Sequence, residues 1–137
     1  MPISLITKIA TLTLPNPTIL SAGILGLTAK SLQAASHAGA GAVTTKSIGL
    51  EPRSGYPNPT IVSLRYGVLN AMGLPNPGAV NYLKELQVAK QESEGIIIVA
   101  SVYGATPKEY AETAKILAKG GADAIELNLS CPNVKQT

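Results

Sequence analysis

The fold is decided by the stretch Lys119-Gly120-Gly121-Ala122-Asp123-Ala124-Ile125-Glu126-Leu127-Asn128-Leu129-Ser130-Cys131-Pro132-Asn133. It contains a helix end, a glycine turn, a short apolar strand and a polar segment where the strand ends, and Pro132 prevents the strand from continuing. A similar junction, Ala38-Gly39-Ala40-Gly41-Ala42-Val43, occurs earlier in the chain. A helix end and a glycine turn before a buried strand, occurring twice, are what a repeated βα unit produces.

Outward from these junctions, strand-like and helix-like segments alternate along the chain. Strands are expected at 18–23, 42–47, 95–102 and 124–127, and helices at 29–38, 79–94 and 107–119. Thr28 and Thr106 are expected N-caps, and Pro107 suits a first helical position. Parallel strands with right-handed crossovers form an open doubly wound sheet or an eight-stranded barrel. Because a barrel needs ~250 residues, a barrel fold would make these 137 residues its first half.

A long connection, 48–78, separates the second strand from the second helix and is rich in Pro, Gly and Asn. Connections of this length are usually functional or disordered. Met72 and Leu74 stand among glycine and prolines, and a disordered segment would not need them there. The pattern therefore favours a binding loop.

The composition bounds the class of protein. Of the 137 residues 45% are hydrophobic, which is enough for a core, and the absence of Phe and Trp makes that core aliphatic. A single cysteine excludes a disulfide framework and a multi-cysteine metal site in the chain, and fits a reducing, cytoplasmic setting. The sequence has no secretory pattern and no apolar run near the ~18 residues of a membrane span. The net charge of +3 is scattered, so nucleic-acid binding is not expected.

Cys131 stands at a polar strand exit, with Asn128, Ser130 and Asn133 beside it. In α/β folds ligands bind at the carboxyl ends of the strands. A thiol at such a place can act as a nucleophile or a proton acceptor. A lone cysteine is also commonly a small buried hydrophobe, and the residues alone leave both interpretations open.

Four segments resemble the class 1 dihydroorotate dehydrogenases, in that family's order and with its approximate spacing. They are Asn16-Pro17 with Ser21-Ala22-Gly23, Thr45-Lys46-Ser47, Asn70-Ala71-Met72-Gly73-Leu74-Pro75-Asn76, and Glu126-Leu127-Asn128-Leu129-Ser130-Cys131-Pro132-Asn133. Each segment alone is a weak signal, and the four in register are a strong one.

The resemblance implies a flavin-binding (β/α)8 barrel, the TIM-barrel fold. Residues 1–137 would be the N-terminal half of this single domain, covering about four βα units. Residues 1–15 would form a hairpin that closes the barrel bottom, and 48–78 would be the active-site loop region. Strands five to eight would carry the phosphate-binding glycines, so the chain alone is expected neither to hold the flavin firmly nor to turn over.

The implied reaction is the FMN-dependent oxidation of (S)-dihydroorotate to orotate in de novo pyrimidine (UMP) biosynthesis. Cys131 would be the general base, while a hydride leaves the neighbouring carbon for the flavin N5. Cysteine instead of serine at this position points to the soluble class. Thiols ordinarily titrate near pH ~8.5, so a thiol base predicts activity that rises with pH.

The resemblance also implies two sets of binding residues, and no metal. The substrate set is Lys46, Asn70, Met72, Gly73, Leu74, Asn128 and Asn133. The cofactor set is Ala22, Gly23, Lys46, Ser47, Ser101 and Asn128. Amides suit a planar anionic ring because each offers donors and an acceptor, and glycine allows a close backbone approach.

The partners and two alternatives stay open. Soluble relatives work as homodimers that reduce fumarate, or with an iron–sulfur/FAD electron-transfer subunit that reduces NAD. A dihydropyrimidine dehydrogenase-like flavoenzyme shares the Asn-Leu-Ser-Cys-Pro core, but Asn133 and Leu74-Pro75 favour dihydroorotate. A noncatalytic half-barrel that binds or assembles with another protein would use its two exposed strand edges.

Overall fold

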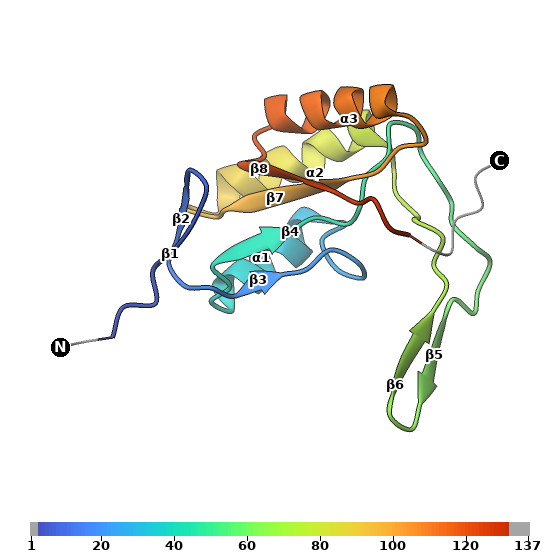
Figure 1. Ribbon diagram of the computed structural model, residues 1–137, viewed down its shortest axis with the longest axis horizontal. Helices are drawn as coiled ribbons and strands as arrows, with labels where there is room; N and C mark the ends of the chain where they lie inside the picture. Colours follow the sequence, from blue (N-terminus) through green and yellow to red (C-terminus); the bar gives the residue numbers. More distant parts are fainter. Residues whose placement is uncertain (1–2, 132–137) are drawn as a thin grey trace.

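A parallel four-stranded sheet lies at the centre of the computed structural model, which describes residues 3–131 (Figure 1). Its strands, in spatial order, are β3 (Ile19–Leu20), β4 (Ala42–Thr44), β7 (Ile98–Val102) and β8 (Ala124–Leu127). The spatial order follows the chain order. All four strands lie within the predicted segments, although β3, β4 and β7 are shorter than predicted.

Three helices form one layer over this sheet: α1 (Ala29–His37), α2 (Ala79–Glu92) and α3 (Pro107–Lys119). Helix α1 contacts α2, and α2 contacts α3. An aliphatic core that also contains Tyr82 fills the space between helices and strands. A doubly wound sheet carries helices on both faces and reverses its strand order, so this arrangement is a segment of an α/β barrel.

The local signals at the helix ends are those predicted from the sequence. The side chain of Thr28 accepts a hydrogen bond from the backbone of Ser31, and Thr106 caps α3 with Pro107 in its first turn. The repeated glycine junctions also share a backbone conformation, since Gly39 and Gly121 have φ of 98° and 105°. Only glycine adopts this region readily, which explains why each helix ends there and releases a strand.

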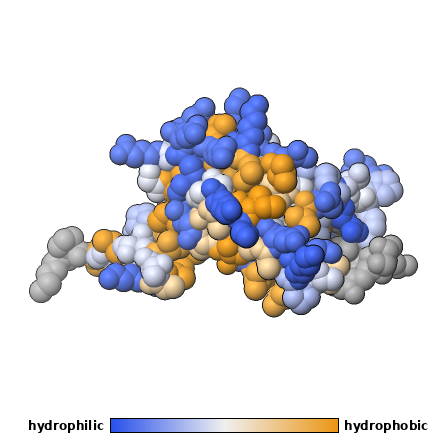
Figure 2. All heavy atoms as spheres, turned by 90° about the horizontal axis from the view of Figure 1, so that it is seen from above, coloured by the Kyte–Doolittle hydropathy of each residue, from blue (hydrophilic) through white to orange (hydrophobic). Residues whose placement is uncertain are grey.

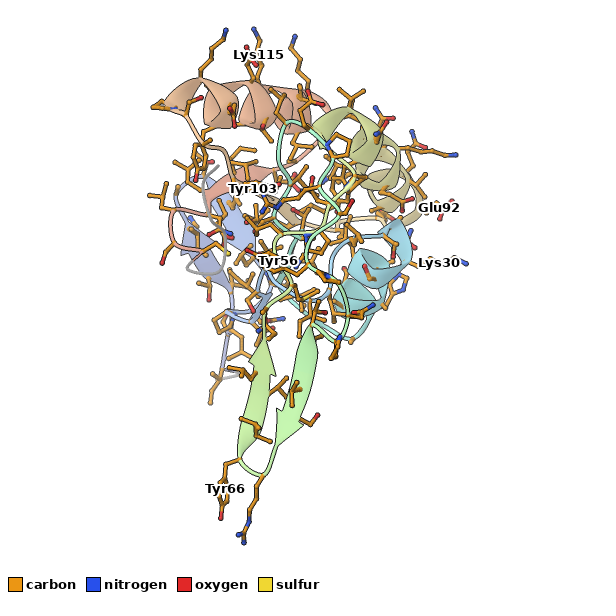
Figure 3. The ribbon with its side chains drawn as sticks, turned by 90° about the vertical axis from the view of Figure 1, so that its right-hand side faces the viewer. Lys30, Tyr56, Tyr66, Glu92, Tyr103 and Lys115 are labelled. Atoms are coloured by element: carbon orange, nitrogen blue, oxygen red, sulfur yellow. The ribbon has the colours of Figure 1, made fainter. Side chains whose placement is uncertain are left out.

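Region 48–78 contains a hairpin that the sequence analysis did not predict. Its strands are β5 (Ile61–Leu64) and β6 (Gly67–Asn70), and every residue in them is exposed. The hairpin projects from the body of the protein, with Tyr66 at its tip (Figure 3). The prolines on its N-terminal side and the lack of an Asn-Gly type turn hide the strand pattern in the sequence.

A second hairpin, β1 (Thr7–Ile9) and β2 (Leu12–Leu14), lies near the amino ends of the sheet strands (Figure 1). It falls within the predicted 1–15 segment, whose residues 1 and 2 lie outside the described range. Whether this hairpin closes a barrel bottom stays a prediction.

Seen from above, the surface of the molecule carries apolar areas beside hydrophilic ones (Figure 2). No helix within residues 3–131 has the length and apolar character to cross a bilayer.

Asp123, directly before β8, forms hydrogen bonds with residues of β7 and α2. Its Oδ2 accepts hydrogen bonds from the backbone N–H of Ile98 at 2.7 Å and from Nζ of Lys90 at 2.8 Å. Asp123→Ala is expected to lower the free energy of unfolding by about 1–3 kcal/mol, because both donors lose a charged acceptor. Urea denaturation measures this change. Glu112→Ala is the control, since its exposed pair with Lys108 contributes only about 0–1 kcal/mol; equal losses in the two variants would contradict the prediction.

Candidate functional site

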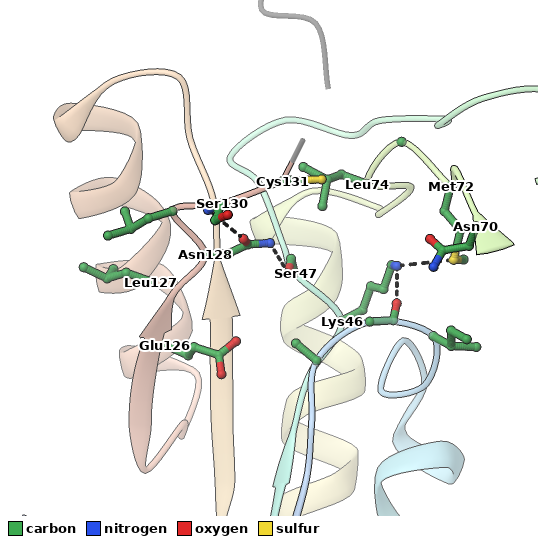
Figure 4. Close-up of a pocket in the computed structure, with 15 residues that line it drawn as sticks. Lys46, Ser47, Asn70, Met72, Leu74, Glu126, Leu127, Asn128, Ser130 and Cys131 are labelled. Carbon is green, nitrogen blue, oxygen red and sulfur yellow. Dashed lines mark hydrogen bonds between the residues drawn. The ribbon is translucent and has the colours of Figure 1, made fainter. Parts of the chain in front are cut away.

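A cavity of about 770 Å³ opens at the carboxyl ends of the sheet strands (Figure 4). Its walls come from the exits of β3, β4 and β8 and from the loop that follows β6. The volume lies within the range of about 300–1,000 Å³ that small-molecule sites occupy. Active sites of α/β barrels lie at this end of the strands, so the cavity is the candidate functional site.

Ala22 and Gly23 line the cavity at the exit of β3. Gly23 has φ of 142°, a backbone conformation that side chains rarely adopt. The loop is fixed one turn later, where Tyr82 donates a 2.6 Å hydrogen bond from Oη to the carbonyl of Gly26. A Cβ on Gly26 would lie 2.7 Å from the carbonyl oxygen of Thr44, so glycine lets this loop pack directly on the neighbouring strand.

Lys46 follows β4 and extends its side chain into the cavity, although only 5% of the residue is exposed. Its Nζ donates to the carbonyl of Gly23 and lies 3.9 Å from Sδ of Met72. The side chains of Lys46 and Asn70 point toward one another (Figure 4). Burial lowers the pKa of Lys46, and the negative form of Cys131 opposes that shift. The cavity thus places an ammonium group within electrostatic range of the thiol.

Asn128 directly follows β8 and is held through both its backbone and its side chain. Its carbonyl accepts a 2.6 Å hydrogen bond from Oη of Tyr110, and its Nδ2 donates to Oγ of Ser47 at 2.9 Å. The hydroxyls of Ser47 and Ser101 lie 3.0 Å apart. Ser101 is fully buried and does not border the cavity. Its hydroxyl therefore lies behind Ser47, where it orders the serine that contacts Asn128.

The loop after β6 forms the wall opposite β8. Asn70 ends β6, and Met72, Gly73 and Leu74 continue along the cavity. Gly73 and Leu74 have positive φ, 74° and 55°. A Cβ on Gly73 would lie 2.7 Å from the ring of Tyr56, so glycine is required both by the backbone conformation and by the packing.

Cys131 is a free, half-buried thiol that borders the same cavity as Lys46 and Asn70. It does not belong to the hydrophobic core between sheet and helices. The remaining predicted ligand, Asn133, lies outside the described residues. The structure thus brings together all the described residues of both predicted sets except Ser101.

Sequence reasoning missed Glu126, whose carboxylate also borders the cavity. Side chains alternate between the two faces of a strand, so Glu126 lies on the same face of β8 as Asn128. That period of two was the signal that could have identified it. Other wall residues not predicted are Ile24, Leu127, Leu129 and Ser130. Within residues 3–131, no group of three or more His, Cys, Asp or Glu side chains could hold a metal ion.

The four segments that form this cavity lie within one family match. The model of the family described as "Dihydroorotate dehydrogenase" matches residues 4–137. The chain belongs to the dihydroorotate dehydrogenase family. The resemblance drawn from the sequence is therefore confirmed at the level of the family.

Archaeal members of the dihydroorotate dehydrogenase family are similar to this chain. It is 52% identical over 124 residues to a protein of Methanocella arvoryzae and 53% identical over 125 residues to one of Methanosarcina mazei; each match covers 90% of this chain and 40% of the relative. A Pyrococcus abyssi protein is 51% identical over 120 residues, covering 88% and 39%. All three are named the catalytic subunit of dihydroorotate dehydrogenase B (NAD(+)). The chain spans about 40% of the length of these relatives.

A solved dihydroorotate dehydrogenase, that of Eimeria tenella in complex with ferulenol, has a similar backbone. The TM-score is 0.83 at 23% sequence identity, and the match covers 96% of this chain and 38% of that one. At this identity the likeness shows the fold. The predicted α/β barrel is thereby confirmed as the fold to which the described strands and helices belong.

Proposed function

We propose that this chain provides the proton-transfer and substrate-binding part of a flavoenzyme that oxidises (S)-dihydroorotate to orotate, in the synthesis of pyrimidine nucleotides. The observation that carries the proposal is the meeting of Cys131, Lys46 and Asn128 around one cavity at the strand exits. Family membership supports the same reaction.

The proposed proton acceptor is Sγ of Cys131. It takes a proton from one ring carbon of dihydroorotate, and a bound flavin would supply the acceptor for the hydride that leaves the neighbouring carbon. Cys131 can reach a ligand because its thiol borders the cavity and is free. General bases need such access within one hydrogen-bond length of the proton that they remove.

Uncharged amides and one ammonium group are proposed to hold the pyrimidine ring. Asn70 and Asn128 border the cavity from opposite sides (Figure 4), and Asn133 would be a third amide. Each amide can donate to ring carbonyl or carboxylate oxygens and accept from ring N–H groups. The backbone at Met72, Gly73 and Leu74 would complete the ligand contacts. Lys46 adds a fixed positive charge, which favours an anionic substrate.

The residues at the exit of β3 fit the flat ring of a flavin. The direction in which a side chain of Gly23 would point is open for 4 Å, so a planar group can approach the backbone there. Ala22, Lys46, Ser47 and Asn128 border the same space, and they would supply hydrogen bonds and apolar contact. FMN is the proposed flavin. Ser101, which was predicted from the resemblance to bind it, would act through Ser47.

Turnover is proposed to need further barrel strands. Among residues 3–131, the edge strands β3 and β8 each pair with a single sheet neighbour. Unpaired strand edges require a partner, and in a barrel the next strands would supply it. The open edges also suit the alternative of a noncatalytic assembly module.

The archaeal relatives are named catalytic subunits of dihydroorotate dehydrogenase B (NAD(+)). For this chain we propose a homodimer that passes electrons to NAD through an iron–sulfur/FAD subunit. A cytoplasmic location is proposed because Cys131 must remain a free thiol to act as a base. Fumarate as acceptor is the other outcome of an acceptor assay on the complex.

The proposal is tested with a chimera in which this chain replaces the matching 125 residues of the Methanosarcina mazei subunit. We expect it to bind flavin and to oxidise dihydroorotate with an artificial dye as acceptor, and not to reduce uracil. The 137-residue chain alone is the control and is expected to be inactive. Uracil reduction would favour the dihydropyrimidine dehydrogenase-like alternative, and a flavin-loaded chimera without either activity would favour the assembly module.

A further inference from the structure

Asn76 lies outside the main cavity, between its loop and the start of α2. Only 6% of the residue is exposed. The resemblance assigned it no ligand, and it is absent from the cavity wall. A buried amide must find hydrogen-bond partners, because an unpaired one is costly.

The Asn76 side chain uses its full hydrogen-bonding capacity. Its Nδ2 donates to the carbonyl of Leu74 at 3.0 Å and to Oη of Tyr103 at 2.8 Å. Its Oδ1 accepts from the backbone N–H of Gly78 at 2.9 Å and of Gly49 at 3.2 Å. An amide has two N–H donors and two lone pairs on its oxygen, so all four are engaged.

These four bonds join separate parts of the barrel rim. Gly49 follows strand β4, Tyr103 follows β7, Gly78 precedes α2, and Leu74 belongs to the cavity loop. The backbone of Asn76 adds a fifth connection, since it exchanges two 2.9 Å hydrogen bonds with Arg53. One side chain therefore fixes the position of the Leu74 loop relative to the ends of strands β4 and β7.

The loop needs such support because its backbone is strained. Leu74 has φ of 55°, a backbone conformation that is disfavoured for residues other than glycine. Its carbonyl is the one that Asn76 holds. The carbonyl of Gly73 is held from the other side by Nε of Arg53 at 2.8 Å. Strained backbone persists when the surrounding structure over-determines it.

We propose that Asn76 is a positioning residue that sets the substrate-contacting loop Met72–Leu74 against the thiol wall of the cavity. The kinetic test of this role rests on the proposed function, whereas the role itself is argued from the hydrogen bonds of Asn76. Asn76 acts through Leu74 and does not touch the ligand. An acceptor-only side chain cannot replace it, because two of its four bonds are donated.

Asn76→Asp in the chimera tests the inference, since it keeps the shape and acceptors but removes both donors. We expect kcat/KM for dihydroorotate to fall by up to about 100-fold, as a misplacement of 1 Å can cost that much, and the KM to rise because the loop contacts the substrate. The pH dependence of kcat should keep its shape because Cys131 is untouched. A merely unstable variant would lose active enzyme and leave KM unchanged.

A second variant of the Asn76 hydrogen-bond network and a control variant complete the test. Tyr103→Phe removes only one acceptor of Asn76 and is expected to raise KM about 3–10-fold. Asn81→Asp is the matched control: an exposed amide that donates one 2.9 Å bond to the carbonyl of Pro77, expected to leave KM unchanged. If Asn76→Asp and Tyr103→Phe both match the wild type in KM, the inference is overturned.

Hydrogen exchange separates this inference from the proposed function. The amide of Tyr56 donates to the carbonyl of Met72 at 3.0 Å and reports on the loop without any turnover. Asn76→Asp should speed its exchange at least about 10-fold, a loss of about 1.4 kcal/mol of protection. If the chimera fails to oxidise dihydroorotate but exchange quickens, the proposed function falls and the positioning role stands; unchanged exchange overturns that role.

Discussion

Replacing Cys131 by alanine in the chimera is expected to reduce the rate of dihydroorotate oxidation by about 10²–10⁴-fold, the usual contribution of a positioned base. Orotate binding should be retained, because the amides of Asn70 and Asn128 and the cation of Lys46 remain around the cavity. Stopped-flow reduction of the flavin measures the rate, and a titration of the flavin absorbance measures orotate binding.

Cys131→Ser is the matched control for shape. An alcohol is a much weaker acid than a thiol, so we expect the serine variant to need a higher pH than the wild type. Its rate of dihydroorotate oxidation should lie between those of the wild type and the alanine variant. Unchanged turnover in Cys131→Ala would remove the thiol from the mechanism.

Lys46→Met should lower turnover by about 10²–10³-fold, the range seen when one electrostatic donor is removed from an active site. At neutral pH the same change should increase the free energy of unfolding of the flavin-free chimera. Burial lowers the pKa of Lys46 below 10.5, so the folded state holds this charge at a cost. Stability and activity therefore move in opposite directions.

The sign of the pH dependence follows from proton binding. Between the lowered pKa of Lys46 and its ordinary value of 10.5, the unfolded chain binds the proton more tightly, so the stability of the wild type increases as the pH is raised. The advantage of Lys46→Met should thus be full below this window and vanish above it. Lys30→Met, at an exposed lysine of α1 (Figure 3), is the control. A difference that grows with pH would contradict the assignment.

The sequence predicted those parts of the fold whose signals are local. Thr28, Thr106 and Pro107 define helix starts through hydrogen bonds within one turn. Gly39 and Gly121 mark helix ends because few other residues adopt their φ. Such signals depend on a few neighbouring residues, and the structure contains each of them.

Features that depend on distant contacts were not predicted. Asn76 looked like one more loop amide, and its importance comes from Gly49 and Tyr103, which are 27 residues away on either side. The resemblance assigned Ser101 to the cofactor, and the structure adds that this serine is buried in β7 with its hydroxyl 3.0 Å from that of Ser47. Which face a strand residue takes follows from the register of the completed sheet.

Both backbone groups of Asn128 are occupied by the protein: its N–H donates to Val102 at 2.8 Å and its carbonyl accepts from Tyr110. The path of the chain at Asn128 itself is consequently fixed by backbone hydrogen bonds, whereas its side chain acts on the next residues, since Oδ1 accepts a 3.4 Å hydrogen bond from the backbone N–H of Ser130. An engineered exchange of this side chain, made to admit a differently substituted heterocycle, would therefore have to keep an acceptor for Ser130, which directly precedes the thiol.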